Sequence, residues 1–170
     1  MQAHNFNGPL AGRATVVEPR RARILYVDDE PQLRTLSELV LVRSGYEVDT
    51  APDGAEAWAA LHDQEYHLLI TDNDMPRLTG LELATQARRA GMRIPIVLAS
   101  GSTDALHNPA NAWLGFAARL PKPFVAGVLV EIVEQVLRIA NSRGKCAGAM
   151  ISVLAHIARV RPFPHGGINE

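Results

Sequence analysis

Residues 24–31 read Ile-Leu-Tyr-Val-Asp-Asp-Glu-Pro. The four apolar residues have the length and composition of a buried strand, and two carboxylates, Asp28 and Asp29, follow directly. Pro31 suits the first turn of a helix, because the N–H that proline lacks would have no helical partner there. This stretch therefore predicts a strand that ends on two acids and leads straight into a helix.

Short apolar runs of this kind recur along the chain, each followed by a segment of helical period. Strands are expected near residues 24–27, 47–51, 67–71, 95–100 and 117–120. Helices are expected near residues 31–44, 53–63, 80–90, 104–114 and 124–140. The alternation is typical of βα repeats, which build an α/β fold around a parallel sheet. Pro109 falls inside the fourth helical segment, so we expect that helix to be short, bent or late.

Two further functional groups stand at the ends of predicted strands. Asp72 directly follows the run at 68–71, and Lys122 directly follows the run at 119–121. Because ligands of open α/β sheets bind beyond the carboxyl ends of the strands, three acids and one base should converge there. An acid cluster of this kind calls for a hard cation, and oxygen ligands suit magnesium. One carboxylate could then act as a nucleophile toward a phosphoryl group.

The composition predicts a soluble, cytoplasmic protein. Its 170 residues allow about one domain plus appendages. No uninterrupted apolar stretch reaches the roughly 18–20 residues of a membrane span, and residues 1–23 lack the apolar core of a secretory signal. Cys146 is the single cysteine, so an internal disulfide is excluded.

The net charge of −1 is distributed unevenly along the chain. Residues 1–23 and 141–170 each carry +3, which leaves −7 for residues 24–140. An acidic centre with basic ends suits a cation-binding core and argues against nucleic-acid binding.

The domain organisation follows from these patterns. We expect a flexible tail at residues 1–22, one domain at 23–140 and a carboxyl-terminal extension at 141–170 without an output domain. Within the extension, residues 146–160 predict one short helix.

Four motifs in order resemble the receiver domain of bacterial two-component response regulators, over about residues 23–140. They are Val27-Asp28-Asp29-Glu30-Pro31, Asp72-x-x-Met75-Pro76 followed by Gly80, Ala99-Ser100-Gly101, and Lys122-Pro123-Phe124. The resemblance implies a doubly wound, five-stranded parallel sheet of flavodoxin-like order 2-1-3-4-5, with helices on both faces. It also implies a cis peptide bond between Lys122 and Pro123.

The same resemblance implies a role for each residue of the site. Asp72 would accept a phosphoryl group from a sensor histidine kinase or a phosphotransfer protein. Lys122 would contact a phosphoryl oxygen, and the Ser100 hydroxyl would donate to another oxygen only in the phosphorylated state. Mg²⁺, with Mn²⁺ as an alternative, would be bound by the ligands Asp28, Asp29, Asp72 and the backbone carbonyl of Asn73.

The function implied is that of a stand-alone, phosphorylation-controlled interaction module. It would be no enzyme beyond weak autocatalytic phosphotransfer and autodephosphorylation. Its partners would be the phosphodonor and an unidentified downstream protein, with a homodimer through the fourth helix, fifth strand and fifth helix as a further expectation. We expect neither a nucleic-acid nor a membrane partner.

Two positions depart from the family pattern. Receiver domains usually carry Tyr or Phe three residues before the lysine, where this chain has Arg119. This arginine is either a charged contact for a partner or simply an exposed side chain. Asp74 adds a carboxylate two residues beyond Asp72, and we expect it to change the lifetime of the phosphoryl group.

Two other functions remain open from the residues. Asp72-Asn73-Asp74 imitates the paired aspartates of haloacid dehalogenase-like phosphatases, in which the second acid is a general acid–base. A receiver fold that binds partners without phosphorylation is the other alternative. Taken alone, Asp29 could also merely cap the helix that begins at Pro31, and Asp53 is expected to cap the second helix.

Overall fold

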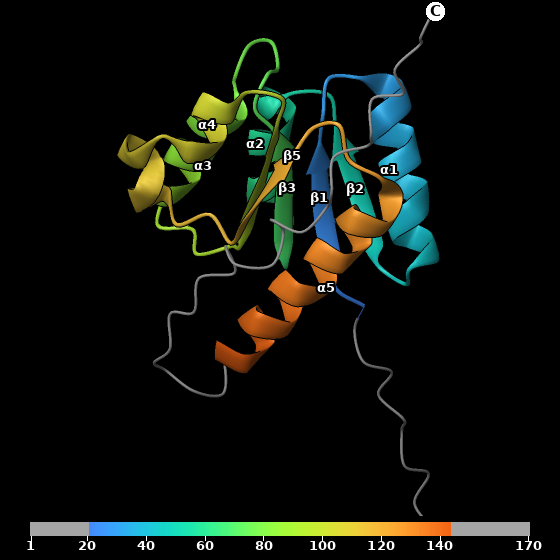
Figure 1. The fold of residues 1–170 in the computed structure, drawn as a ribbon. Coiled ribbons are helices and arrows are strands. Elements are labelled where there is room, and N and C mark those ends of the chain that lie inside the picture. Colours follow the sequence, from blue (N-terminus) through green and yellow to red (C-terminus); the bar gives the residue numbers. More distant parts are fainter. Residues whose placement is uncertain (1–20, 144–170) are drawn as a thin grey trace, which may run out of the picture.

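The structure is a computed structural model that describes residues 21–143, and it contains one five-stranded parallel sheet in the order β2-β1-β3-β4-β5 (Figure 1). The predicted fold class and strand order are therefore confirmed. The elements in chain order are β1 (Arg23–Val27), α1 (Pro31–Arg43), β2 (Glu47–Ala51), α2 (Gly54–Asp63), β3 (Leu68–Asp72), α3 (Gly80–Arg89), β4 (Ile96–Ser100), α4 (Thr103–His107), the 3₁₀ helix η1 (Pro109–Leu114), β5 (Ala118–Pro121) and α5 (Ala126–Arg143).

Helices cover both faces of the sheet, with α1 and α5 on one face and α2 and α3 on the other (Figure 1). Alternate residues of β1 enter the two cores: Ile24 and Tyr26 pack toward α1 and α5, whereas Leu25 and Val27 pack toward α2 and α3. A strand buried on both faces has no polar side, which explains the continuous apolar runs in the sequence. Within residues 21–143, no helix combines the length and hydropathy that crossing a membrane requires.

The strand register brings the functional segments to one edge of the sheet. Val27 of β1 pairs with Thr71 of β3, so the residues that follow them, Asp28 and Asp72, lie side by side. On the other side of β3, Ser100 of β4 pairs with Pro121 of β5, directly before Lys122. The strand order reverses at β1 and β3, the position where open α/β sheets bind ligands.

Helix termini follow the local sequence signals. Pro31 opens α1, and Gly45 after its end adopts a φ of 93°, which favours glycine. The Asp53 carboxylate accepts hydrogen bonds from the N–H groups of Ala55 and Glu56, which confirms its predicted capping role.

The fourth helical segment differs from the single helix expected at 104–114. It is divided into α4, which ends at His107, and η1, which begins at Pro109. Proline lacks the N–H that would continue α4, and the Asn108 side chain instead caps the new turn through the N–H of Ala110. The expectation of a short or bent helix is confirmed.

The carboxyl end of the domain also differs slightly from the prediction. Helix α5 begins at Ala126 and continues to Arg143, beyond the expected end at residue 140. The tail predicted at 1–22 lies almost entirely outside the described residues, and the short helix predicted at 146–160 lies wholly outside them.

Two glycines with different surroundings give a matched test of packing beneath the site. A Cβ on Gly80 would overlap the Asp72 carbonyl oxygen and lie 2.9 Å from the Asp72 carbonyl carbon, whereas a Cβ on Gly127 of α5 would meet nothing within 4 Å. We expect Gly80→Ala to lower the free energy of unfolding by about 1–3 kcal/mol through overpacking. Gly127→Ala should raise it by about 0.5 kcal/mol, because alanine loses less backbone entropy in a helix. Urea denaturation measures both, and equal effects would contradict the close approach at Gly80.

Candidate functional site

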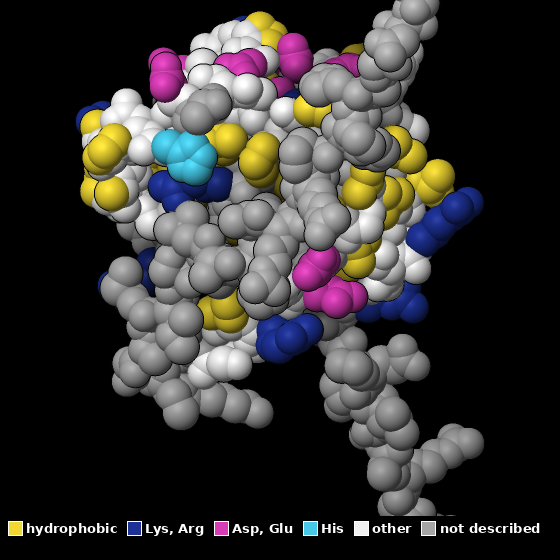
Figure 2. Space-filling view, viewed as in Figure 1, with side chains coloured by type: hydrophobic (Ala, Val, Ile, Leu, Met, Phe, Trp, Pro, Cys, Tyr) yellow, Lys and Arg dark blue, Asp and Glu magenta, His cyan; other side chains and the backbone are white. Residues whose placement is uncertain are grey.

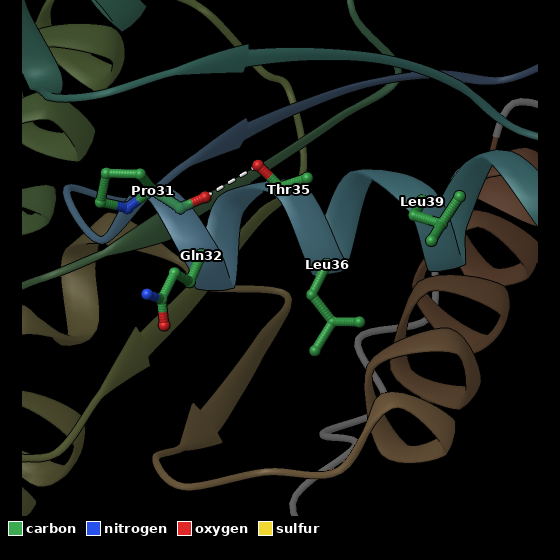
Figure 3. A pocket seen from close by; sticks show the side chains of 5 residues that line it. All are labelled: Pro31, Gln32, Thr35, Leu36 and Leu39. Carbon is green, nitrogen blue, oxygen red and sulfur yellow. Dashed lines mark hydrogen bonds between the residues drawn. The ribbon is translucent and has the colours of Figure 1, made fainter.

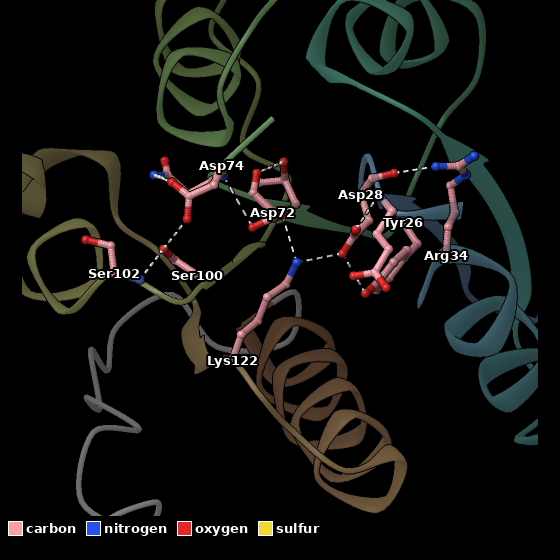
Figure 4. A network of polar contacts seen from close by, with 11 residues as sticks. Tyr26, Asp28, Arg34, Asp72, Asp74, Ser100, Ser102 and Lys122 are labelled. Atoms are coloured by element: carbon pink, nitrogen blue, oxygen red, sulfur yellow. Dashed lines mark hydrogen bonds and ion pairs between the residues drawn. The ribbon is translucent and has the colours of Figure 1, made fainter. Parts of the chain in front are cut away.

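Three carboxylates meet at the carboxyl edge of the sheet. Figure 4 shows two of them, Asp28 and Asp72, on either side of Lys122. Asp28 and Asp29 follow β1, and Asp72 ends β3. Each offers an oxygen, and these oxygens all lie within 4.8 Å of one another. Asp28 and Asp72 are buried and Asp29 is exposed, so the cluster opens to solvent on one side. The convergence predicted from the strand ends is present.

Lys122 lies between the two buried carboxylates. Its ammonium Nζ is 2.7 Å from Asp72 Oδ2 and 2.9 Å from Asp28 Oδ2. Burial lowers the pKa of Lys122, but hydrogen bonds to Asp72 and Asp28 and their charges outweigh that effect and raise the pKa above its usual value. The lysine is therefore charged at neutral pH. Three carboxylates and one ammonium leave the cluster with a formal excess of two negative charges.

The Asp28 side chain is oriented by its own segment. Its Oδ1 accepts a hydrogen bond of 3.0 Å from the N–H of Glu30, and its Oδ2 accepts one of 3.4 Å from the Tyr26 hydroxyl. Burial raises the pKa of Tyr26, so its hydroxyl stays protonated and can donate. Arg34 donates to the Asp28 backbone carbonyl. Glu30 is the N-cap of α1 and makes no side-chain cap, and Asp29 lies in the acid cluster.

The segment after Asp72 is held through its backbone. The N–H of Asn73 donates to the Ala99 carbonyl of β4, and the Asn73 carbonyl accepts from the N–H of Gly80 at 3.3 Å. The Asn73 side chain donates to Asp74 Oδ1 at 3.0 Å, while its own buried Oδ1 has no hydrogen-bond partner among the described residues. Because it already accepts from Gly80, the backbone carbonyl of Asn73, a predicted metal ligand, retains only part of its accepting capacity.

Ser100 is buried at the end of β4, and its hydroxyl is turned toward Asp74, a contact that the sequence did not indicate (Figure 4). It donates to Asp74 Oδ2 at 3.3 Å and accepts from the N–H of Ser102 at 3.0 Å. Asp74 also approaches Asp72, since its N–H lies 3.3 Å from Asp72 Oδ1. Asp74 therefore belongs to the site, and its position two residues after Asp72 was the one available signal.

Arg119 of β5 is half-buried, not fully exposed. Its guanidinium carbon lies 5.4 Å from the centre of the Phe116 ring, a cation–π arrangement. Its Nε is buried and has no hydrogen-bond partner within residues 21–143. The peptide bond between Lys122 and Pro123 is cis, as the resemblance implied.

A shallow apolar depression lies on α1 (Figure 3). Leu36 and Leu39, which line it, are about half exposed, and so is Val42 farther along the helix. Figure 2 shows hydrophobic side chains gathered over α1. The depression begins at Pro31, two residues after Asp29, so it adjoins the functional edge of the sheet. Its lining residues are Pro31, Gln32, Thr35, Leu36 and Leu39.

Known proteins that match this chain include response regulators. The response regulator receiver domain family matches residues 24–134. The alkaline phosphatase synthesis transcriptional regulatory protein PhoP of Bacillus subtilis is 33% identical over 116 residues, which cover 68% of this chain and 48% of PhoP. Response regulator RppA of Synechocystis is 40% identical over 122 residues, which cover 68% of this chain and 50% of RppA. The chain thus spans about half the length of these two curated relatives.

A solved structure of a response regulator is also similar to this chain, and the match covers nearly all of that structure's chain. The response regulator protein TrrA from Thermotoga maritima, in complex with Mg²⁺ and BeF, is 34% identical, with a TM-score of 0.62 over 68% of this chain and 98% of that one. These matches give no support to the phosphatase alternative. From its sequence, its strand order and these matches, the chain belongs to the response regulator receiver domain family.

Proposed function

We propose that this receiver accepts a phosphoryl group on Asp72 from a sensor histidine kinase or a phosphotransfer protein and signals through a changed interaction surface. One observation carries the proposal: Lys122 Nζ lies 2.7 Å from Asp72 Oδ2, inside a cluster that keeps an excess of negative charge. Asp72 stands at the end of the central strand β3, next to both Asp28 and Ser100.

The transfer asks little covalent chemistry of the protein. An Asp72 carboxylate oxygen forms a bond to phosphorus as the bond between phosphorus and the donor's imidazole nitrogen breaks, and the imidazole leaves. Such transfers depend mainly on positioning and on neutralising charge. The Lys122 ammonium, a compact point charge, would move from the carboxylate pair to an oxygen of the bound phosphoryl group. The Ser100 hydroxyl would donate to a second phosphoryl oxygen.

A divalent cation fits the donor set. Asp28, Asp29, Asp72 and the Asn73 carbonyl would hold Mg²⁺, or Mn²⁺ in its place, because all four offer oxygen and the cluster has charge left over after Lys122. When bound, the cation would neutralise the negative charge that accumulates between the acids and the incoming phosphoryl oxygens. The likeness to TrrA, which was solved with Mg²⁺ and BeF, supports this part of the proposal.

The phosphodonor protein would dock on the apolar face of α1. That face presents Leu36, Leu39 and Val42 to solvent and begins two residues beyond Asp29. A protein seated on it would lie next to the edge that carries Asp72. Apolar side chains that are half exposed in the free protein gain burial on docking.

The output would pass through the face formed by α4, β5 and α5, to a downstream protein or a second copy of the chain. Arg119 lies on β5 in the middle of that face, so the contact would depend on charge as well as on apolar packing. We propose no metabolic substrate, only weak autocatalytic phosphotransfer and autodephosphorylation.

Phosphorylation itself is tested by intact mass after incubation with Mg²⁺ and acetyl phosphate. The wild-type chain should gain one phosphoryl group, and so should Asp63→Asn, which changes an exposed carboxylate at the end of α2. Asp72→Asn should gain none, because it lacks the nucleophile. Labelling of Asp72→Asn would assign the acceptor elsewhere. An unlabelled wild-type chain would favour phosphorylation-independent binding, and steady hydrolysis of a generic phosphomonoester would favour the phosphatase alternative.

Charge balance at the site is tested by Lys122→Met. In a chelating buffer, the loss of the ammonium leaves the buried carboxylates unpaired and should lower the free energy of unfolding by on the order of 3 kcal/mol. Added Mg²⁺ should recover much of that loss. The control Arg89→Met, at an exposed position of α3, should change the free energy of unfolding by less than about 0.5 kcal/mol. Urea denaturation with and without Mg²⁺ gives the comparison, and a loss insensitive to Mg²⁺ would contradict the shared role of lysine and cation.

Docking on α1 is tested by Leu36→Glu. The variant should be phosphorylated by acetyl phosphate at the wild-type rate, while transfer from the autophosphorylated histidine kinases of the source organism should slow by roughly tenfold. Trp113→Glu, which also places a carboxylate at an exposed apolar position, is the control and should leave both rates unchanged. An equal slowing with acetyl phosphate would mean that Leu36 supports the site itself and not the docking of a protein.

A further inference from the structure

The Ser100 hydroxyl is already engaged in this structure, and its acceptor is not Asp72. It donates to Asp74 Oδ2 at 3.3 Å, while its oxygen accepts from the N–H of Ser102 at 3.0 Å (Figure 4). Ser100 is fully buried, whereas Asp74 is exposed and reaches in from the segment between β3 and α3. The contact therefore joins the end of β4 to the segment that follows the proposed phosphoacceptor.

A serine hydroxyl has one hydrogen and can donate it to one acceptor at a time. In the proposed function, the phosphoryl group on Asp72 needs that same hydrogen. Asp74 and the phosphoryl group are therefore competing acceptors. A bond to a carboxylate is stronger than a neutral one, so the competition carries a measurable free energy.

Asp74 is itself held in the competing position. Its Oδ1 accepts from the Asn73 side-chain amide at 3.0 Å, and its own N–H lies 3.3 Å from Asp72 Oδ1. These contacts aim the second oxygen, Oδ2, at Ser100. The backbone below is fixed by the hydrogen bond of 2.9 Å between the Asn73 N–H and the Ala99 carbonyl.

We propose that Asp74 is a positioning residue that holds the Ser100 hydroxyl away from Asp72 until phosphorylation supplies a better acceptor. The inference rests on the proposed function and adds a free-energy cost to the step in which Ser100 turns to the phosphoryl group. Any group that binds at Asp72 and recruits Ser100 must first break the bond to Asp74. Removing the Asp74 carboxylate should therefore favour the state in which Ser100 contacts the phosphoryl group.

A simple charge effect would act in the same direction, because Asp74 also repels an anionic ligand. The two effects separate in a Ser100→Ala background. Repulsion by Asp74 persists there, whereas competition for the hydroxyl does not. A double-mutant cycle on Asp74 and Ser100 therefore isolates the proposed competition.

The probe is beryllofluoride with saturating Mg²⁺, a phosphoryl analogue, titrated calorimetrically into the full chain. Asp74→Ala should bind it about tenfold more tightly than wild type. In the Ser100→Ala background, the same substitution should change affinity by less than about twofold. Asp74→Asn, which retains an acceptor oxygen but loses the charge, should fall between wild type and Asp74→Ala. Equal tightening in both backgrounds, or none in either, would overturn the proposal.

A second measurement needs no ligand. The amide of Ser102, which donates to Ser100 Oγ, should shift in the nuclear magnetic resonance spectrum of unphosphorylated Asp74→Ala and exchange faster with solvent, because Ser100 loses its anchor. An unchanged Ser102 amide would overturn the proposal even if the analogue bound. If wild type fails to bind the analogue while the Ser102 amide shifts as expected, the proposed phosphorylation fails and the contact between Asp74 and Ser100 stands.

Discussion

The two ion pairs of Lys122 are the interaction on which the functional edge depends. They join the chain's fifth strand to its first and third, because Lys122 follows β5 while Asp28 and Asp72 follow β1 and β3. Buried charges cost several kcal/mol each to remove from water, and only close partners offset that cost. The sheet order delivers Lys122 between the two buried acids, where it is the close cationic partner of both.

The same edge combines two features on which the proposed function and the proposed restraint of Ser100 rest. The cluster has negative charge in excess of its lysine, which favours a divalent cation. Beside it, the Ser100 hydroxyl is committed to Asp74 and not to Asp72. In the proposed function, a phosphoryl group on Asp72 together with a bound cation would draw the Ser100 hydroxyl away from Asp74 and so shift the end of β4. The proposed signal is that shift, transmitted to α4 and β5.

Much of this fold was predictable because its signals are local. The three inner strands β1, β3 and β4 are short apolar runs buried on both faces, whereas the edge strands β2 and β5 are partly exposed. Each strand boundary falls within one residue of the expected one. Pro109 divided the fourth helix for the reason that its missing N–H predicts, and Asp53 capped α2 as its position suggested. The acid cluster was also predictable, since parallel strands all end at one edge of the sheet.

The sequence by itself determined the βα order, the strand ends and the set of residues that meet at Asp72. Only the tertiary structure decided which of them touch. Asp74 and Ser100 are 26 residues apart, and the direction of a single hydroxyl hydrogen between them has no periodic signal. The cation–π contact between Arg119 and Phe116 and the exposure of Leu36 on α1 likewise have no periodic signal in the sequence. Such contacts depend on side-chain rotamers and on packing across elements, which a linear pattern does not encode.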